Sequence, residues 1–273
     1  MLLLTAVPAG QFTSSTTVVE VYATVTDATG RPVKGLTQSD FEVIEDGAAQ
    51  KVTNFAAGEF PLRVALTLDR SFSVAGRPLE ASKRAALGFL AALRPTDESV
   101  VLGIGSEVTT VADASLSREQ QSAAVQALDA WGTTKLHDAI IQAIDETDAA
   151  RGRRAVVILS DGDDRYSDAS AGAVLTRARR ANVLIYPVAL SKNRPALFAE
   201  LSSVTGGRSF HVPDLKTLDA TLVKIASELR EQYLLGYSPS RAFVAGRDEW
   251  RSITVRVKKP NLTVRARDGY YVK

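Results

Sequence analysis

Three segments that lie far apart in the chain carry side-chain oxygens of the kind that bind hard metal ions. The first is an apolar run, residues 63–68, followed by Asp69, Ser71 and Ser73. One carboxylate and two hydroxyls at alternating positions present three oxygens where a buried strand ends. Oxygen ligands of low total charge suit Mg²⁺, Ca²⁺ or Mn²⁺ better than zinc or copper. The carboxyl ends of strands are also where open α/β sheets bind their ligands.

Two later segments supply further ligands of the same type. Thr134 lies in a turn, residues 132–138, that leads into a predicted helix, where its hydroxyl can point at the edge of the sheet. Asp161 follows the apolar run 155–159 and precedes a glycine. Strands of a parallel sheet that run side by side end at the same edge. We therefore expect Asp69 and Asp161 to converge on one ion.

The pattern of apolar residues that must position these side chains divides the chain into three regions. Residues 16–60 read as β structure, with strands at 17–26 and 41–45, the hairpin turn Asp46–Gly47, and 50–55 returning as a partner strand. From 61 to 232, short apolar runs alternate with helical stretches. This alternation predicts an α/β domain with a doubly wound, mostly parallel sheet and helices on both faces. β patterning resumes in residues 233–273.

The two terminal β segments are each too small to be stable alone. We expect them to pack together as a small β-sandwich-like module, with the α/β domain inserted between them in sequence. The strands expected in the α/β domain are 64–68, 100–105, 155–159, 183–188 and a short one near 210. The helices expected there are 79–93, 119–131, 136–150, 171–181, 196–204 and 218–231.

Taken together, the three oxygen-bearing motifs resemble those of the von Willebrand factor type A (VWFA) domain family with its metal-ion-dependent adhesion site (MIDAS). The family's Asp-x-Ser-x-Ser matches Asp69, Ser71 and Ser73, its threonine matches Thr134, and its Asp-Gly matches Asp161. The resemblance covers about residues 61–215, with the motifs in the family's order. It implies a Rossmann-like fold and a divalent cation held by these five residues, directly or through water. An acidic group from a protein partner would complete the coordination.

Other residues around the motifs are interpreted as support rather than as ligands. Phe72 stands where the family often has glycine, and the alternation of the strand predicts that Arg70 points away from the ion. We expect Asp138 to lie behind the ligands and to orient a ligand hydroxyl or a water molecule. Three acids of the third segment are interpreted as a solvated rim, with a calcium ligand among them as the alternative. These acids are Asp163, Asp164 and Asp168.

The flanking segments resemble a bacterial group of VWFA-related proteins that is abundant in acidobacteria. The residues that carry this resemblance lie at 27–47, 233–239 and 269–271. It implies an exported protein that is secreted, periplasmic or attached to the cell envelope. Residues 1–15 are either the tail of a secretory signal or a disordered or misassigned start, and we place them outside the fold.

Composition excludes several other classes of function. With 33 basic and 31 acidic residues the net charge is +2, so there is no basic footprint for nucleic acid. There is no cysteine, hence no thiolate site, and no apolar run approaches the ~18 residues of a membrane span. We interpret both histidines, His137 and His211, as surface residues. The tryptophans and the tyrosines at 233, 237, 270 and 271 are interpreted as packing residues.

The sequence thus favours a metal-dependent protein-binding or adhesion module that uses Mg²⁺, or else Mn²⁺ or Ca²⁺. Two alternatives stay open: a Mg²⁺-dependent hydrolase or phosphotransfer enzyme at the same edge, and a structural envelope subunit with an idle metal site. The enzyme is disfavoured because the chain has no phosphate loop and no nucleophile elbow. Ser71 also stands where an aspartyl-phosphate phosphatase would need a second acid. Finally, serines and aspartates at a strand end often only cap the next helix.

Overall fold

A six-stranded sheet forms the centre of the computed structural model, which describes residues 18–58, 60–148, 152–243, 246 and 248–272. The strand order is β10-β9-β8-β5-β6-β7, and every neighbouring pair is parallel except β6 and β7. The strands are β5 (Leu62–Asp69), β6 (Glu98–Ile104), β7 (Val108–Ala112), β8 (Arg153–Ser160), β9 (Leu184–Ala189) and β10 (Phe210–His211). Five of them were predicted. The antiparallel edge strand β7 was missed, because its Val-Thr-Thr-Val-Ala is only partly buried and forms no apolar run.

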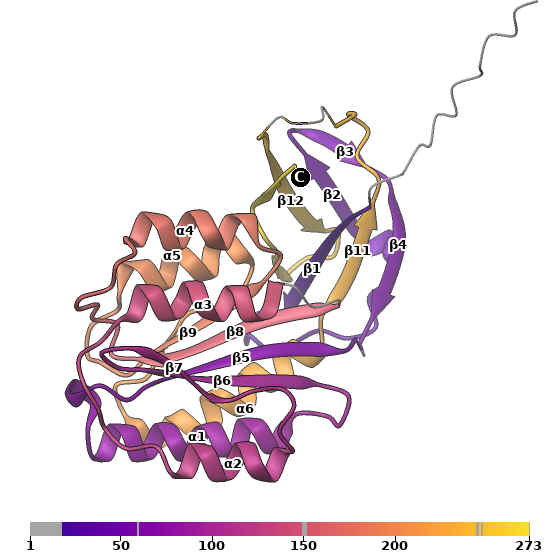
Figure 1. Cartoon of the computed structure of the whole chain (residues 1–273). Helices are drawn as coiled ribbons and strands as arrows, with labels where there is room; N and C mark the ends of the chain where they lie inside the picture. Colours follow the sequence, from indigo (N-terminus) through magenta and orange to yellow (C-terminus); the bar gives the residue numbers. More distant parts are fainter. Residues whose placement is uncertain (1–17, 59, 149–151, 244–245, 247, 273) are drawn as a thin grey trace, which may run out of the picture.

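Helices cover both faces of this sheet, so the doubly wound architecture is confirmed (Figure 1). One face carries α1 (Arg77–Ala92), α2 (Arg118–Gln126) and α6 (Leu218–Arg230), and the other carries α3 (Leu136–Asp148), α4 (Ala171–Arg180) and α5 (Ala196–Thr205). Each face buries its own apolar core, and the central strands are buried on both sides. None of the helices in the described ranges combines the length and apolarity that a membrane span requires.

The helix predicted at 119–131 is wrong over its last turn, because α2 ends at Gln126. The chain there leaves the helix to form a loop, in which the Trp131 amide donates to the Arg70 carbonyl at 2.7 Å. The residues at 149–150, predicted as the end of α3, and the first 15 residues lie outside the described ranges.

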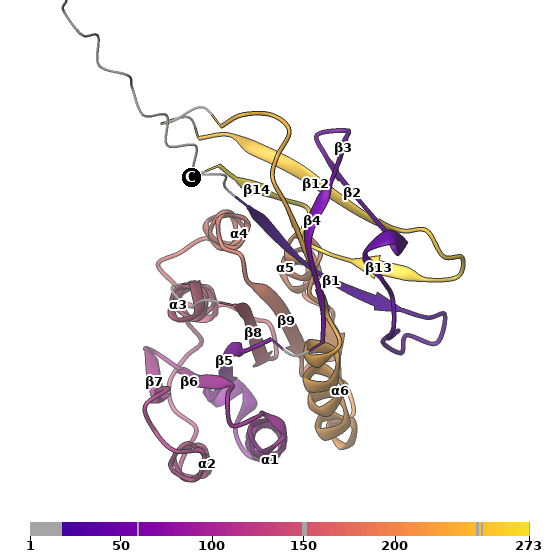
Figure 2. The same cartoon turned by 90° about the vertical axis from the view of Figure 1, so that its right-hand side faces the viewer.

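The strands from the two ends of the chain form a β-sandwich beside the α/β domain (Figures 1 and 2). Its two sheets have the orders β13-β1-β11-β4 and β14-β12-β2-β3. The strands are β1 (Val19–Thr26), β2 (Phe41–Glu45), β3 (Ala48–Gln50), β4 (Val52–Ala57), β11 (Tyr233–Tyr237), β12 (Trp250–Val257), β13 (Thr263–Arg265) and β14 (Gly269–Tyr271). Each sheet mixes strands from both ends of the chain, and their apolar faces share one core. The exact division at residues 61 and 232 stays a prediction.

The predicted hairpin turn is present, but its second strand differs from the prediction. Asp46 and Gly47 have φ values of 46° and 82°, as a tight two-residue hairpin requires, and β2 pairs with β3. The expected partner strand 50–55 is wrong, because β4 pairs instead with β11 in the other sheet. The Phe55 ring there stacks on Tyr233 with 6.0 Å between ring centroids, so this segment is anchored by the sandwich core.

A buried ion pair lies inside the sandwich. Glu45 and Arg251 are both buried, with 3.2 Å between Oε1 and Nη1. The hydroxyls of Tyr237 and Tyr270 donate to Glu45 Oε2 at 2.7 and 2.9 Å. Burial, and then the Glu45 charge, raises the pKa of both tyrosine hydroxyls. The interpretation of these tyrosines, together with Tyr233, as packing residues is confirmed.

Candidate metal centre

Four of the predicted ligands form one chain of short oxygen–oxygen contacts at the carboxyl edge of the main sheet. The Ser71 hydroxyl donates to Asp69 Oδ1 at 2.6 Å and lies 3.0 Å from the Ser73 hydroxyl. The Ser73 hydroxyl donates to Asp161 Oδ2 at 2.7 Å. The structure therefore brings together three side chains at and just after the end of β5 with one that directly follows β8.

The pairing of β5 with β8 explains this convergence. The two strands are parallel neighbours, with Leu68 opposite Leu159, so both end at the same edge of the sheet. Ser160, which was not predicted, joins them, because its hydroxyl donates to Asp69 Oδ2 at 2.6 Å. A serine directly after the apolar run 155–159 and directly before Asp161 was the available signal.

The cluster has a buried floor and an open side. Asp69, Ser71 and Thr134 are buried, Asp161 is half-buried and Ser73 is exposed. Phe72, which is itself exposed, does not close the cluster over, because Ser73 next to it is exposed as well. The arrangement can therefore hold an ion on one side and leave it accessible from the other.

The cluster contains two carboxyl groups, and no basic side chain of the described residues pairs with either of them. Burial raises the pKa of the Asp69 carboxyl, the hydrogen bonds from Ser160 and Ser71 oppose this effect, and the Asp161 charge raises the pKa further. Within the described ranges, neither Asp69 nor Asp161 forms an ion pair with a basic side chain. No group of three or more His, Cys, Asp or Glu is placed to bind a metal among these residues. The cluster instead combines two carboxylates with hydroxyls, the donor set that suits a hard cation.

Thr134 lies in a loop that contacts both of the other motif segments. The Phe72 amide donates to the Gly132 carbonyl at 3.0 Å, and the Arg165 amide donates to the Thr134 carbonyl at 2.7 Å. Gly132 has a φ of 77°, and a Cβ at this position would collide with Ser106, so the loop requires glycine here. The Thr134 hydroxyl has no hydrogen-bond partner among the described residues, and its role as a ligand stays a prediction.

Asp138 holds the backbone of the third segment. Its two carboxylate oxygens accept hydrogen bonds from the amides of Asp168 and Ala169, at 3.0 and 2.9 Å. These bonds fix the loop that follows Asp161 against the start of α3. The predicted orientation of a ligand hydroxyl or water by Asp138 stays a prediction.

The acids of the third segment do not share one role. Asp163 and Asp168 are exposed, in agreement with the solvated rim. Asp164 was misplaced there: it is half-buried, and its Oδ1 accepts a hydrogen bond from the His137 amide at 3.0 Å. His137, interpreted as a surface residue of the helix, is half-buried on α3, and its ring lies with Nδ1 3.0 Å from the Ala169 carbonyl. Both residues tie the third segment to α3.

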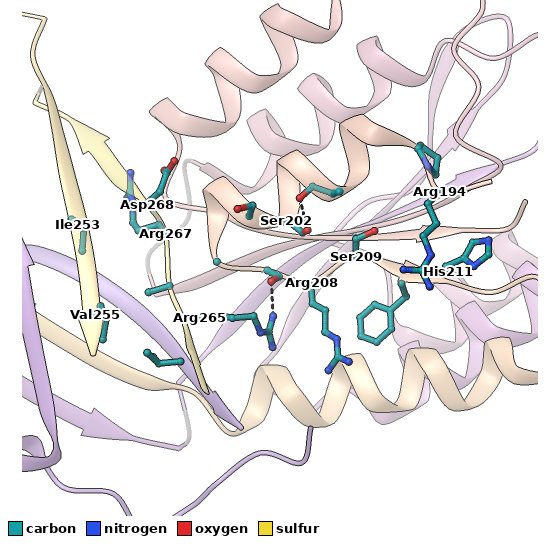
Figure 3. Close-up of a pocket in the computed structure, with 18 of the residues that line it drawn as sticks. Arg194, Ser202, Arg208, Ser209, His211, Ile253, Val255, Arg265, Arg267 and Asp268 are labelled. Carbon is teal, nitrogen blue, oxygen red and sulfur yellow. Dashed lines mark hydrogen bonds between the residues drawn. The ribbon is translucent and has the colours of Figure 1, made fainter. Parts of the chain in front are cut away.

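A separate cleft of about 860 Å³ lies where α5 and β10 face β12 and β13 (Figure 3). Arginines line it, among them Arg194, Arg208 and Arg265, and Arg265 pairs with Glu228 at 2.6 Å. Sequence analysis had singled out only His211 in this cleft, where its Nε2 lies 3.0 Å from the Lys192 carbonyl. The cleft shares none of its lining residues with the metal cluster.

The carboxyl edge of this doubly wound α/β domain gathers carboxylates and hydroxyls from two strand ends, and open α/β sheets in general bind their ligands at that edge. The family model of the von Willebrand factor type A domain matches residues 64–224, and the chain belongs to this family.

Solved structures share the fold at low sequence identity. A von Willebrand factor type A protein from Catenulispora acidiphila is 14% identical with a TM-score of 0.56, and the match covers 93% of this chain and 73% of that one. An aerotolerance-related membrane protein from Bacteroides fragilis (16% identity, TM-score 0.51) matches over 62% of this chain and 98% of its own. The von Willebrand domain of the type V pili tip protein Mfa5 from Porphyromonas gingivalis is 11% identical with a TM-score of 0.51. The match covers 63% of this chain and 95% of that one. No curated protein sequence matches the chain.

Proposed function

We propose that this protein is a metal-dependent protein-binding module of the adhesion type. A Mg²⁺ ion, or Mn²⁺ or Ca²⁺ in its place, is held by an oxygen cluster and binds an acidic side chain of a partner protein. The proposed ligands are Asp69, Ser71, Ser73, Thr134 and Asp161. The observation that carries this proposal is the chain of contacts from Asp69 through two serines to Asp161, in which two carboxylates meet without a basic partner.

The open side of the cluster supports capture of a partner rather than catalysis. A divalent cation held by hydroxyls and only two carboxylates keeps positive charge and favours one more anionic oxygen from outside. Exposed Ser73 lies beside this open position. We propose no catalytic residue.

We place the protein outside the cytoplasm of a bacterium, as a secreted, periplasmic or envelope component. The support is the resemblance of its flanks to exported bacterial proteins and the fold it shares with a pili tip protein and a minor pilin.

Calorimetry and affinity capture test the proposal together. Titration of Mg²⁺ into the wild type should show one site, which Ser73→Ala weakens and the matched control Ser203→Ala, on an exposed face of α5, leaves unchanged. Immobilised wild-type protein should retain a partner from the native envelope fraction in Mg²⁺ and release it in EDTA. Retention that ignores both EDTA and Ser73→Ala would refute capture through the metal.

A further inference from the structure

Exposed aromatic side chains gather around the candidate metal centre. Within the described ranges, the exposed aromatic residues are Phe72, Trp131 and Tyr166, with 66%, 42% and 76% of their surfaces accessible. One lies on each of the three loops that carry the predicted metal ligands. Trp131 packs on Gly105 and against Arg70, as its interpretation as a packing residue predicted, but it also leaves 42% of its surface exposed.

Backbone hydrogen bonds place these three residues around one loop. The Phe72 amide donates to the Gly132 carbonyl at 3.0 Å, directly beside Trp131. The residue before Tyr166 donates its amide to the Thr134 carbonyl at 2.7 Å. The loops that carry Phe72 and Tyr166 are thus both tied to the Trp131–Thr134 segment, and the three loops are the ones that carry the predicted metal ligands.

Tyr166 is held in an unfavourable backbone conformation. Its φ is 73°, in the left-handed region that bulky residues avoid. The neighbours on both sides are fixed, since the Arg165 amide donates to the Thr134 carbonyl at 2.7 Å and the Ser167 hydroxyl donates to Asp164 at 2.6 Å. Strained residues cluster at functional sites. Here the fixed loop projects a large aromatic ring into solvent, where packing within this chain does not require it.

Charged side chains of both signs flank the rings, so the site for an acidic group of the partner is the metal ion. The Arg70 guanidinium lies 5.8 Å from the centre of the Trp131 ring, and Arg165 is exposed. However, Asp129 and Asp163 are exposed as well. Aromatic residues and arginine are the types enriched at the core of protein–protein interfaces. Such an interface needs apolar anchors on the partner to bury the rings, besides an anion for the cation.

We propose that Phe72, Trp131 and Tyr166 form an aromatic rim that selects the partner. The ligand is a protein segment in which an aspartate or glutamate is flanked by bulky apolar side chains. The acid binds the metal ion, and its neighbours pack on the rings. This inference rests on the proposed metal-dependent function and adds the sequence class that the site prefers.

Selection from a peptide library tests the rim. Peptides with random residues on both sides of a fixed central glutamate are bound to immobilised protein in Mg²⁺ and eluted with EDTA. The eluted peptides should be enriched in Leu, Phe, Tyr or Trp next to the glutamate. The double variant Phe72→Ala/Tyr166→Gly removes two exposed rings, and glycine suits the left-handed backbone at 166, so the fold should tolerate it.

The double variant should bind the selected peptides about tenfold more weakly, which is ~1.4 kcal/mol. Its thermal stabilisation by Mg²⁺ should equal that of the wild type. The control Val223→Ala, which trims an exposed apolar side chain on α6, should keep both properties. Binding can be followed by the fluorescence of Trp131 in a Trp250→Phe background, since the chain has two tryptophans.

Three results would overturn the inference in distinguishable ways. EDTA-eluted peptides without apolar enrichment, or an unchanged affinity of the double variant, would overturn the rim and leave the metal-dependent function in place. A wild type that shows no Mg²⁺ stabilisation and no EDTA-dependent binding would overturn the proposed function and the rim together. If the protein retained polyuronate but no peptide, the ligand would be an acidic glycan and the proposed protein partner would be wrong.

Discussion

Asp69→Asn gives the sharpest test of the metal centre, because the structure predicts opposite consequences with and without Mg²⁺. Asp69 is fully buried, and burial raises the pKa of its carboxyl, so the ionised form is unfavourable in the metal-free protein. Asparagine removes this charge. Its amide oxygen can keep both hydrogen bonds from Ser71, and its amide nitrogen can donate to the Ser160 hydroxyl. We expect the metal-free variant to lie within about 1 kcal/mol of the wild type.

Addition of Mg²⁺ should separate the two proteins. At a concentration 100 times the dissociation constant, the ion stabilises the wild type by ~2.7 kcal/mol. For a domain of this size that is a rise in Tm of roughly 5–11 °C. The variant should show almost none of this rise. The matched control is Asp163→Asn, which removes an exposed carboxylate from the neighbouring loop and should keep the full shift.

Differential scanning calorimetry with EDTA and with Mg²⁺ measures both effects. If metal-free Asp69→Asn protein were several kcal/mol less stable than the wild type, the Asp69 charge would not destabilise the metal-free fold, which contradicts the prediction. If Mg²⁺ raised the Tm of the variant as much as that of the wild type, the ion would bind at a site other than Asp69.

Two further predictions follow from buried charges. Because the pKa of Asp69 is raised from 3.8, its contribution to the stability of the metal-free protein declines as pH rises from 3.8 through the raised value, and the Mg²⁺-induced rise in Tm should grow over the same window. Thermal scans from pH 3 to 7 check this, and a Mg²⁺ shift independent of pH would contradict it. In the sandwich, Glu45→Gln removes the nearer of the two acidic partners of buried Arg251, leaving only Glu249 at 3.7 Å, and should cost about 3 kcal/mol in urea unfolding. Glu42→Gln, in an exposed pair, should cost less than ~1 kcal/mol.

The sequence predicted the α/β domain well because its signals are local. The buried parallel strands β5 and β8 contain the mainly apolar runs 64–68 and 155–159, and the amphipathic helices between the strands repeat at the helical period. Strand pairing in the sandwich was harder to predict. Whether Val52–Ala57 pairs with its neighbour β2 or with distant β11 depends on contacts between opposite ends of the chain, which no local pattern encodes.

The metal-site motifs could also be predicted because their signals are local in sequence. The contacts that support them could not. Asp69 and Asp161 end apolar runs, and parallel pairing brings strand ends together. Ser160, in contrast, reads as the last residue of a strand until its hydroxyl is seen on Asp69. Asp164 and His137 are far apart in sequence, and only the packing of a loop against α3 gives them their role.

A count of protons explains why this cluster should bind either a cation or an additional proton. Four short contacts link its oxygens: Ser160 to Asp69, Asp69 to Ser71, Ser71 to Ser73, and Ser73 to Asp161. The serines supply only three hydroxyl protons, because each hydroxyl donates once. With both carboxylates ionised, one contact therefore brings two electron-rich oxygens together without a proton between them. At low pH a proton on Asp69 can fill this gap, in line with its raised pKa. At neutral pH a divalent cation can do so while the serines keep donating to the carboxylates, so protons and metal ions should compete for the same place.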